Sequence, residues 1–406
     1  MERVPKIIDS GIEFYPKRNK FGKVTKKFES VLDANQIKGI EQLLTAATKA
    51  IGARLLIADG PGVGKTMQLL ALAWAQAKRT NEPSLIVTKN QLLLDSMREE
   101  AKGNCIGSRR VHFTSYEHLQ HTLECNNYST ILFDEAHVLS SHPMLNELQT
   151  GFKTTTIIMA SATAFSSPDN FSTITSILEQ QSKEHAARTV GLGCIGEDFI
   201  PLKNWGTVAT NISNAKYSLM EQGRCVQRQL VFDGQAEWQT IEGGQDQQIM
   251  AHELKNIVEN EIDNGKKVIL YSRSKEKLET YLKEFNPSEF KKFKAGKSNL
   301  IILDPTENAE GLRLHDRSGK HPRTIIIDEP VDISELIQIQ GRVHRRNSQS
   351  KSKILGLFDP SCDWHLEKLE DIKCQASFLI EQRETCPALG KELIQREPTT
   401  GMNLAV

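Results

Sequence analysis

The stretch Ala58-Asp59-Gly60-Pro61-Gly62-Val63-Gly64-Lys65-Thr66 follows an apolar run at 54–58 and leads into a helical pattern. A glycine-rich loop between a buried strand and a helix brings backbone N–H groups close to phosphate oxygens at the positive end of the helix. Asp59 stands where the simple consensus for such loops has glycine. Because strand, loop, Lys-Thr and helix coincide, the stretch predicts a phosphate-binding loop in a parallel α/β sheet rather than a chance glycine-rich turn.

The residue types in this loop suit a nucleoside triphosphate. Gly62 and Gly64 let backbone N–H groups approach the β-phosphate, and Lys65 neutralises the β and γ oxygens. The Thr66 hydroxyl can hold Mg²⁺. We therefore expect ATP and Mg²⁺ to be bound by Gly60, Gly62, Val63, Gly64, Lys65 and Thr66.

A second motif ends the apolar run Thr130-Ile131-Leu132-Phe133 with Asp134-Glu135-Ala136-His137. Asp134 would hold Mg²⁺ through water, and Glu135 would orient and deprotonate the water that attacks the γ-phosphate. By itself, an acidic pair after a strand is usually a solvated turn. The loop at Lys65 favours the catalytic interpretation.

Three further segments complete the expected site. Ser161-Ala162-Thr163 follows the next strand, and its hydroxyls could bridge the acidic loop to a second domain. In Gln338–Arg346, Arg342 and Arg345 are three residues apart, so a helix would place both guanidinium groups on one face as arginine fingers. A basic helix facing solvent or nucleic-acid phosphates is the alternative. Gln338 and the loop containing Gly311 are further candidates for contact with the nucleotide.

Strand-like runs alternate with helical stretches twice along the chain, which is typical of parallel α/β sheets. A helix with apolar residues from Met250 to Ile262 opens the second half, and Gly265 is its expected C-cap. We divide the chain into an arm at 1–30, a first domain at 31–185, an intervening glycine-containing segment at 186–245, a second domain at 246–375 and a tail at 376–406. The expected strands are 54–58, 85–88, 111–114, 130–134 and 156–161, then 267–271, 299–303, 324–328 and 353–358.

Composition limits the possible classes of protein. The 406 residues exceed what one core usually organises, and no apolar run is long enough for a membrane span. The start has no secretory signal, and the seven cysteines form no paired framework, so we expect reduced thiols in a cytoplasmic or nuclear protein, or in one encoded by a virus or parasite. The net charge is zero, so any nucleic-acid surface must be local. The basic run Lys17–Lys27 is one candidate, and a solvated arm is the plainer interpretation.

These motifs follow the order of helicase superfamily 2. Gln36 precedes the phosphate loop as the adenine-reading glutamine does in that superfamily, although a glutamine on a helix surface is the alternative. Asp59 before the glycines and Gly341-Arg342-Val343-His344-Arg345 resemble the Swi/Snf-type and strawberry notch branches. Strawberry notch is the closer resemblance, in Asp59–Lys65, in Gly341–Gln349 and in the stretch Arg228-Gln229-Leu230-Val231-Phe232. Thr66, Ala136, Arg313 and Ser348 depart from those branches.

The resemblance implies two tandem RecA-like α/β domains with an ATP cleft between them, and ATP-driven movement on nucleic acid. DNA, and duplex DNA in particular, is expected as the partner rather than RNA, and no membrane is expected. Three alternatives stay open: an RNA helicase, a regulatory scaffold that binds ATP with little turnover, and an ATPase acting on a non-nucleic substrate.

Overall fold

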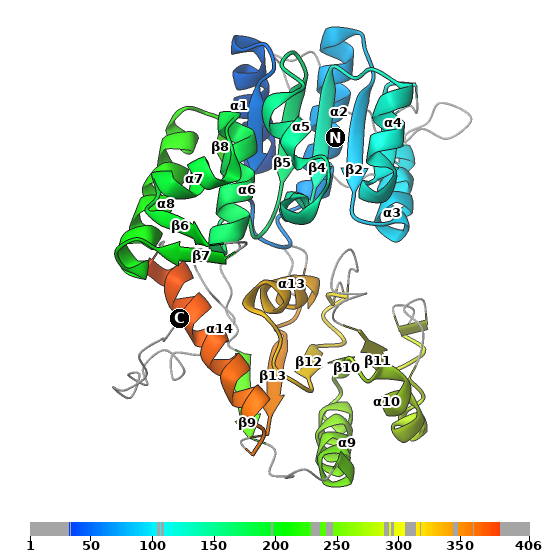
Figure 1. The fold of residues 1–406 in the computed structure, drawn as a ribbon. Coiled ribbons are helices and arrows are strands. Elements are labelled where there is room, and N and C mark those ends of the chain that lie inside the picture. The colour runs from blue at the N-terminus through cyan, green and yellow to red at the C-terminus, as the bar shows by residue number, and fades with distance from the viewer. Residues whose placement is uncertain are drawn as a thin grey trace, which may run out of the picture. The chain divides into compact units, whose positions relative to one another are not determined.

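The computed structural model describes residues 32, 34–103, 106, 109–195, 198–228, 236–240, 247–287, 292–293, 296–304, 314–316, 318–343, 348–359 and 361–381. The chain divides into two compact units, Met1–Leu230 and Val231–Val406. Each unit contains its own sheet and its own apolar core (Figure 1).

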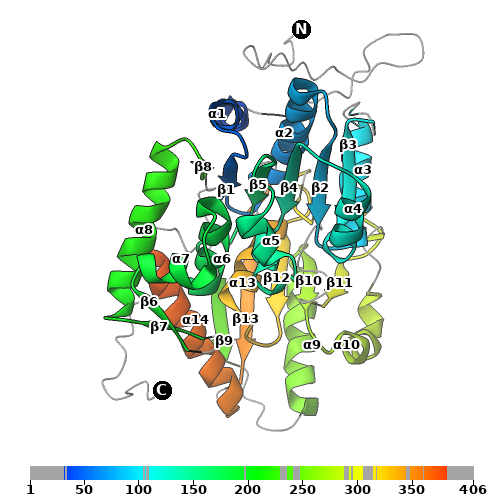
Figure 2. The same ribbon diagram turned by 45° about the horizontal axis from the view of Figure 1, so that its top comes forward.

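The first unit is built on a six-stranded sheet with the order β3-β2-β4-β5-β1-β8. All of its pairings are parallel, and Figure 2 shows the strands in this succession across the unit. Helices cover both faces of a parallel sheet, and its strands therefore consist of apolar residues along nearly their whole length. The strands are β1 (Arg54–Ile57), β2 (Ser84–Thr88), β3 (Val111–Ser115), β4 (Thr130–Asp134), β5 (Thr156–Ala160) and β8 (Cys225–Val226).

Helices and one hairpin surround this sheet. Helix α2 packs against β2 and β4, and α6 packs against α7 and α5. An antiparallel hairpin, β6 (Leu192–Ile195) with β7 (Asp198–Pro201), precedes α8. The helices are α1 (Ala34–Lys49), α2 (Lys65–Thr80), α3 (Gln91–Gly103), α4 (Leu119–Cys125), α5 (Leu145–Thr150), α6 (Pro168–Glu179), α7 (Lys183–Thr189) and α8 (Trp205–Glu221), with 3₁₀ turns at Tyr116–His118 and Ala136–Ser141.

The second unit has a five-stranded parallel sheet with the order β11-β10-β12-β13-β9. Helix α9 ends at Asp263, and Gly265, the predicted C-cap glycine, follows it with a φ of +75° and an N–H that donates to Ile262 O at 2.9 Å. Its strands are β9 (Ala236–Thr240), β10 (Lys267–Tyr271), β11 (Leu300–Leu303), β12 (Arg323–Ile327) and β13 (Lys353–Phe358). Its helices are α9 (Gln247–Asp263), α10 (Lys275–Tyr281), α13 (Ile333–Val343) and α14 (Asp363–Glu381), with a 3₁₀ turn at Lys283–Phe285.

The α/β class with two parallel sheets is confirmed, and every predicted strand is present with its ends within one residue of the prediction. The strands that were not predicted are short or polar. The predicted nucleotide cleft between the two domains is a relation between the units, and it stays a prediction.

The structure differs from the sequence division at 186–245. Residues 186–228 belong to the first unit, where β8 pairs with β1, whereas β9 pairs with β13 in the second sheet. Two-residue β8 gives no periodic signal, and β9 has a polar sequence typical of an edge strand. The predicted tail boundary at 376 falls inside α14. The arm at 1–30, including Lys17–Lys27, lies outside the described residues, as does 382–406.

In the described part of the chain, no helix is long and apolar enough to cross a membrane. The described cysteines are free, and the reduced state of all seven stays a prediction. The described ones are Cys125, Cys194, Cys225, Cys362 and Cys374.

Candidate nucleotide site

Three strands of the first sheet end in one row and so bring the predicted motifs together. Ile57 of β1 and Asp134 of β4 both pair with Ala160 of β5. Neighbouring strands lie about 4.8 Å apart, so the ends of β1 and β4 are on the order of 10 Å from each other. The phosphate loop, the acidic pair and the Ser161–Thr163 segment therefore all start at one edge of the sheet.

The loop after β1 needs its glycines for their backbone conformation. Gly62 and Gly64 have φ values of +79° and +100°, which side-chain-bearing residues rarely adopt. A Cβ atom on Gly64 would lie 2.4 Å from Gln36 Nε2, so the space beside it is also filled. Helix α2 begins directly afterwards at Lys65 and directs its N-terminal N–H groups toward the loop.

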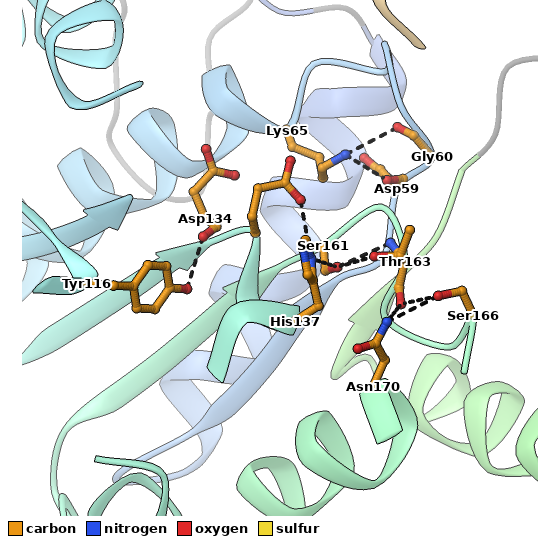
Figure 3. A network of polar contacts seen from close by, with 11 residues as sticks. Asp59, Gly60, Lys65, Tyr116, Asp134, His137, Ser161, Thr163, Ser166 and Asn170 are labelled. Atoms are coloured by element: carbon orange, nitrogen blue, oxygen red, sulfur yellow. Dashed lines mark hydrogen bonds and ion pairs between the residues drawn. The ribbon is translucent and has the colours of Figure 1, made fainter. Parts of the chain in front are cut away.

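Lys65 is buried and turned back over the loop. Its Nζ donates to Asp59 O at 3.1 Å and to Gly60 O at 3.5 Å (Figure 3). Carbonyl oxygens thus take the place that phosphate oxygens would hold in a nucleotide complex. The ammonium group is already at the loop, so binding a phosphate requires an exchange of partners rather than a large movement of the side chain.

Gln36 lies on α1 against the same loop. Its side chain is 4% exposed, and Nε2 donates to Val63 O at 2.8 Å. The alternative of a glutamine on a helix surface is therefore wrong. The predicted contact with adenine stays a prediction, since the observed partner is the backbone of the loop.

The acidic pair ends β4 with an unusual backbone at Glu135. Asp134 is 7% exposed, and its carbonyl accepts a hydrogen bond from the Tyr116 hydroxyl at 3.0 Å (Figure 3). Glu135 has φ 51° and ψ 51°, in the left-handed region. A non-glycine residue held there stores strain, which is characteristic of functional positions.

The Glu135 carboxylate is available for a further interaction. Its Oε2 is buried and makes no hydrogen bond within the described chain, and His137 Nδ1 lies 3.6 Å away. A buried acceptor without a hydrogen bond is uncommon, and a water molecule would satisfy it. This environment fits the predicted role of Glu135 in orienting the attacking water.

A hydroxyl network joins the acidic turn to the end of β5. His137 Nδ1 and Ser161 Oγ lie 3.2 Å apart, and Thr163 N donates to Ser161 Oγ at 3.1 Å. The Thr163 carbonyl accepts from Ser166 Oγ and Asn170 Nδ2, each at 3.0 Å, as Figure 3 shows. The Ser161–Thr163 segment thus contacts the acidic turn as expected, and its predicted bridge to the second domain stays a prediction.

The donor set fits a magnesium nucleotide. In the described residues, no group of three or more His, Cys, Asp or Glu side chains could hold a metal by itself. Mg²⁺ in phosphate-loop enzymes takes few ligands from the protein and the rest from phosphates and water. Thr66 at the start of α2 and Asp134 at the end of β4 supply such a limited set.

Sequence reasoning missed the partner of Asp59. This carboxylate is 0% exposed. It accepts hydrogen bonds from Arg228 Nε at 3.0 Å, from Arg228 Nη2 and from Gln68 Nε2 at 2.8 Å. Asp59 therefore stands in the glycine position because it forms a buried ion pair. The strawberry notch resemblance included both Asp59 and Arg228, but nothing in either motif indicated that they meet.

The second unit holds the other predicted residues on α13. Gln338 and Arg342 are four residues apart on this helix, hence on one face, and both are buried. The Arg342 carbonyl accepts a hydrogen bond from Leu314 N at 3.1 Å. Gly311 and Arg345 lie outside the described residues.

Asp316 holds together the loops that flank the end of α13. It accepts hydrogen bonds from the N–H groups of Ser318 and His321 and from the Ser350 hydroxyl. Burial opposes ionisation, but these donors outweigh it and lower the pKa of Asp316 far below its usual value. Leu314, which contacts Arg342, is two residues away, so the end of the candidate finger helix has fixed surroundings.

Comparison with known proteins finds a family match within the first unit. Residues 53–166 match the family model described as "Schlafen group 3, DNA/RNA helicase domain". Among solved structures, the chain is similar to the Sulfolobus solfataricus SWI2/SNF2 ATPase core in complex with dsDNA. The identity is 15%, the TM-score is 0.42, and the alignment covers 86% of this chain and 93% of that one. No curated protein sequence matches the chain.

The family match spans the phosphate loop, the acidic pair and the Ser161–Thr163 segment. Residues 53–166 are therefore similar to a helicase domain, and they form most of the parallel sheet of the first unit. An ATPase associated with nucleic acid is the general class that this combination indicates.

Proposed function

We propose that this chain hydrolyses ATP to translocate along nucleic acid, and that duplex DNA is its preferred track. The observation that carries the proposal is the common row of strand ends, in which Ile57 and Asp134 pair with the same residue of β5. That row brings a lysine-bearing phosphate loop and a strained, half-buried glutamate to one site.

Each residue has a defined role in this proposal. Bound Mg²⁺–ATP supplies the phosphoanhydride bond to be broken. Lys65 neutralises phosphate charge, Thr66 and Asp134 hold the cation, and Glu135 orients the attacking water and accepts its proton. Gln36 contacts adenine from α1, next to the loop that it already touches at Val63.

The second unit contributes Arg342 and Arg345 as arginine fingers, with Gln338 and Gly311 as further nucleotide contacts. In this proposal, closure of the two domains around ATP completes the site, and nucleic acid favours the closed state. The burial and fixed surroundings of Arg342 support a positioned guanidinium rather than a mobile surface arginine.

The preference for duplex DNA rests on the strawberry notch and Swi/Snf-type resemblance in Asp59–Lys65 and Gly341–Gln349. Branches of this kind are translocases on duplexes more than strand separators. In the described part of the second unit, every strand belongs to one parallel sheet, so these strands offer no hairpin to split a duplex.

Two assays with the full chain test the proposal. Displacement of a third strand from a DNA triplex reports translocation on duplex, and a forked duplex reports unwinding; Glu135→Gln is the control in both. We expect ATP-dependent triplex displacement and little fork unwinding. Unwinding without displacement would make the protein a conventional helicase, and activity on RNA alone would make it an RNA helicase. ATP binding without turnover would favour the regulatory scaffold.

Phosphate contacts should dominate binding to the track. Affinity for duplex DNA should then fall steeply as salt rises, despite the zero net charge of the chain. The slope of a log–log plot of the binding constant against salt measures the number of phosphates neutralised. A flat plot would contradict binding through the backbone.

A further inference from the structure

Arg228 lies in the segment that leaves the first unit. Strand β8 pairs with β1 at Cys225 and Val226, and backbone bonds continue beyond it. Ala58 N donates to Val226 O and Gly60 N donates to Arg228 O, each at 2.8 Å. The chain that leads out of the first unit is therefore attached to the first residues of the phosphate loop.

The Arg228 guanidinium binds three elements at once. Besides its two bonds to the Asp59 carboxylate, Nη2 donates to Gln68 Oε1 on α2, and Nη1 donates to Asn35 O at the start of α1. Gln68 Nε2 in turn donates to Asp59 Oδ2 at 2.8 Å. The Asp59 side chain is fully buried, whereas 22% of the Arg228 side chain is exposed.

Both ends of the phosphate loop depend on residues next to these contacts. Lys65 donates to the carbonyl of Asp59, the residue whose carboxylate Arg228 binds. Gln36, which holds Val63 O at the far end of the loop, follows Asn35 directly in α1. A change at Arg228 would thus disturb the support of Lys65 and of Gln36 together.

Gly39 shows that α1 accommodates this guanidinium. A Cβ atom at Gly39 would lie 3.0 Å from Arg228 Nη1, closer than ordinary contact. Glycine weakens a helix interior, so it is a poor choice in the middle of α1 unless space is needed. The close approach of Arg228 provides that reason.

We propose that Arg228 is a positioning residue for the nucleotide site, coupling the shape of the phosphate loop to the segment that leads to the second unit. It acts through Asp59 and touches no reacting atom. A buried carboxylate without its partner is strongly unfavourable, and only a guanidinium supplies two parallel donors to it while reaching Gln68 and Asn35. This inference rests on the proposed ATPase function.

Arg224 offers a matched control on the same segment. Its Nη1 donates to Glu179 Oε1 at 2.8 Å, and its Nη2 donates to Leu178 O. It therefore also joins a carboxylate and a carbonyl at the end of α6, and its Nε donates to Arg54 O at 3.3 Å, at the end of β1 that is opposite to the phosphate loop. If arginines on this segment had only a structural role, substitution of Arg224 and of Arg228 would have similar effects on ATP binding.

The experiment measures ATP binding by calorimetry, steady-state kcat and KM, and the Tm without nucleotide, all on the full chain. Arg228→Gln should raise the Kd and KM for ATP about tenfold or more while kcat changes less than about threefold. Arg228→Lys should give an intermediate Kd. Arg224→Gln should lower the Tm but leave the Kd within about twofold.

Two further variants separate positioning from loss of stability. The double variant Asp59→Asn/Arg228→Gln removes the unpaired buried charge, so it should bind ATP more tightly than Arg228→Gln alone. Gly39→Ala crowds the guanidinium without removing any charge, and should raise the Kd severalfold without lowering the Tm, since alanine favours the helix.

The outcomes distinguish this inference from the proposed function. If the wild-type chain binds ATP, and Arg228→Lys and Gly39→Ala bind it equally well, Arg228 has only a structural role and the inference is overturned. If the wild-type chain does not bind ATP, the proposed function fails and the inference fails with it. The expected pattern, a raised Kd at Arg228 and Gly39 but not at Arg224, supports both.

Discussion

The two units end a central strand with nearly the same sequence. Thr130-Ile131-Leu132-Phe133-Asp134-Glu135 ends β4 in the first unit, and Thr324-Ile325-Ile326-Ile327-Asp328-Glu329 ends β12 in the second. Both strands are buried along their whole length and have neighbours on either side. From the local sequence, the two acidic pairs are equivalent.

Their surroundings differ. Glu135 has a left-handed backbone, and the phosphate loop follows a strand that ends in the same row. Glu329 is not among the described residues with positive φ, and Arg273 Nε lies 3.5 Å from its carboxylate. Arg273 also lies 3.7 Å from Glu335. Glu329 Oε1, like Glu135 Oε2, is buried and makes no hydrogen bond within the described chain, so the two glutamates differ in their backbone conformation and in their charged neighbours.

Burial also changes the ionisation of the second pair. Asp328 retains some exposure to solvent, and burial of the rest of the side chain raises the pKa of its carboxyl to about 7. Burial likewise raises the pKa of Glu329, although Arg273 opposes the change. An acidic pair after a strand thus becomes a candidate catalytic site only where a glycine loop with its lysine shares the same edge.

The largest difference between the two pairs is expected in hydrolysis. Glu135→Gln should lower kcat by up to about 10⁴-fold with ATP affinity retained, because a positioned general base contributes at most about this factor. Glu329→Gln, the same change at the matching strand end, should leave kcat within about threefold. Single-turnover hydrolysis and equilibrium ATP binding are measured for each variant. Equal losses of hydrolysis rate in the two variants would mean that the two strand ends have the same role.

The second unit should act through α13 rather than through its strand end. Arg342→Ala should lower kcat on the order of 10³-fold with ATP affinity nearly unchanged, because arginine fingers act chiefly in the transition state. Arg273→Gln, which removes the arginine beside Glu329, is the control and should have little effect on kcat. A loss of ATP affinity with kcat intact would make Arg342 a ground-state phosphate ligand.

A smaller effect is expected in stability against pH. The raised pKa of Asp328 means that the folded chain binds more protons than the unfolded chain between about pH 4 and pH 7, so this group lowers stability as pH rises through that range. Asp328→Asn should therefore raise the Tm of the second unit more at pH 7.5 than at pH 5. An equal gain at both pH values would show that Asp328 does not titrate in this range.

Asp316 should have the opposite effect on the change of stability with pH. Its pKa is lowered in the folded chain, so its stabilising effect is present above the ordinary pKa of aspartate and is lost as pH falls through the lower folded value. Asp316→Asn should lower the Tm at pH 7 and less so in acid. Thermal unfolding of both variants across pH therefore tests the two environments together.

The parts of this fold that sequence predicted are those with local signals. Strands such as β4 and β12 are uninterrupted apolar runs, and their ends were predicted within one residue. The phosphate loop was found because glycine, lysine and threonine must occur there in order. Strand β9 is not predicted because its residues are mostly polar, and β8 is not predicted because it has only two residues.

The contacts that complete the site are not local. Asp59 and Arg228 are 169 positions apart, so the ion pair exists only once β8 has joined β1. The left-handed backbone of Glu135 has no signal in the residue type, which ordinarily avoids it. Tertiary structure imposes both features, and both are at the candidate site rather than in the core.

The most direct test of the central claim is the rate of ATP hydrolysis by the full chain, measured without nucleic acid and with equal concentrations of duplex DNA, single-stranded DNA and RNA. The site in the first unit predicts hydrolysis that duplex DNA accelerates severalfold and that Lys65→Ala abolishes through loss of ATP binding. A rate unchanged by every nucleic acid, or one that survives Lys65→Ala, would contradict the account.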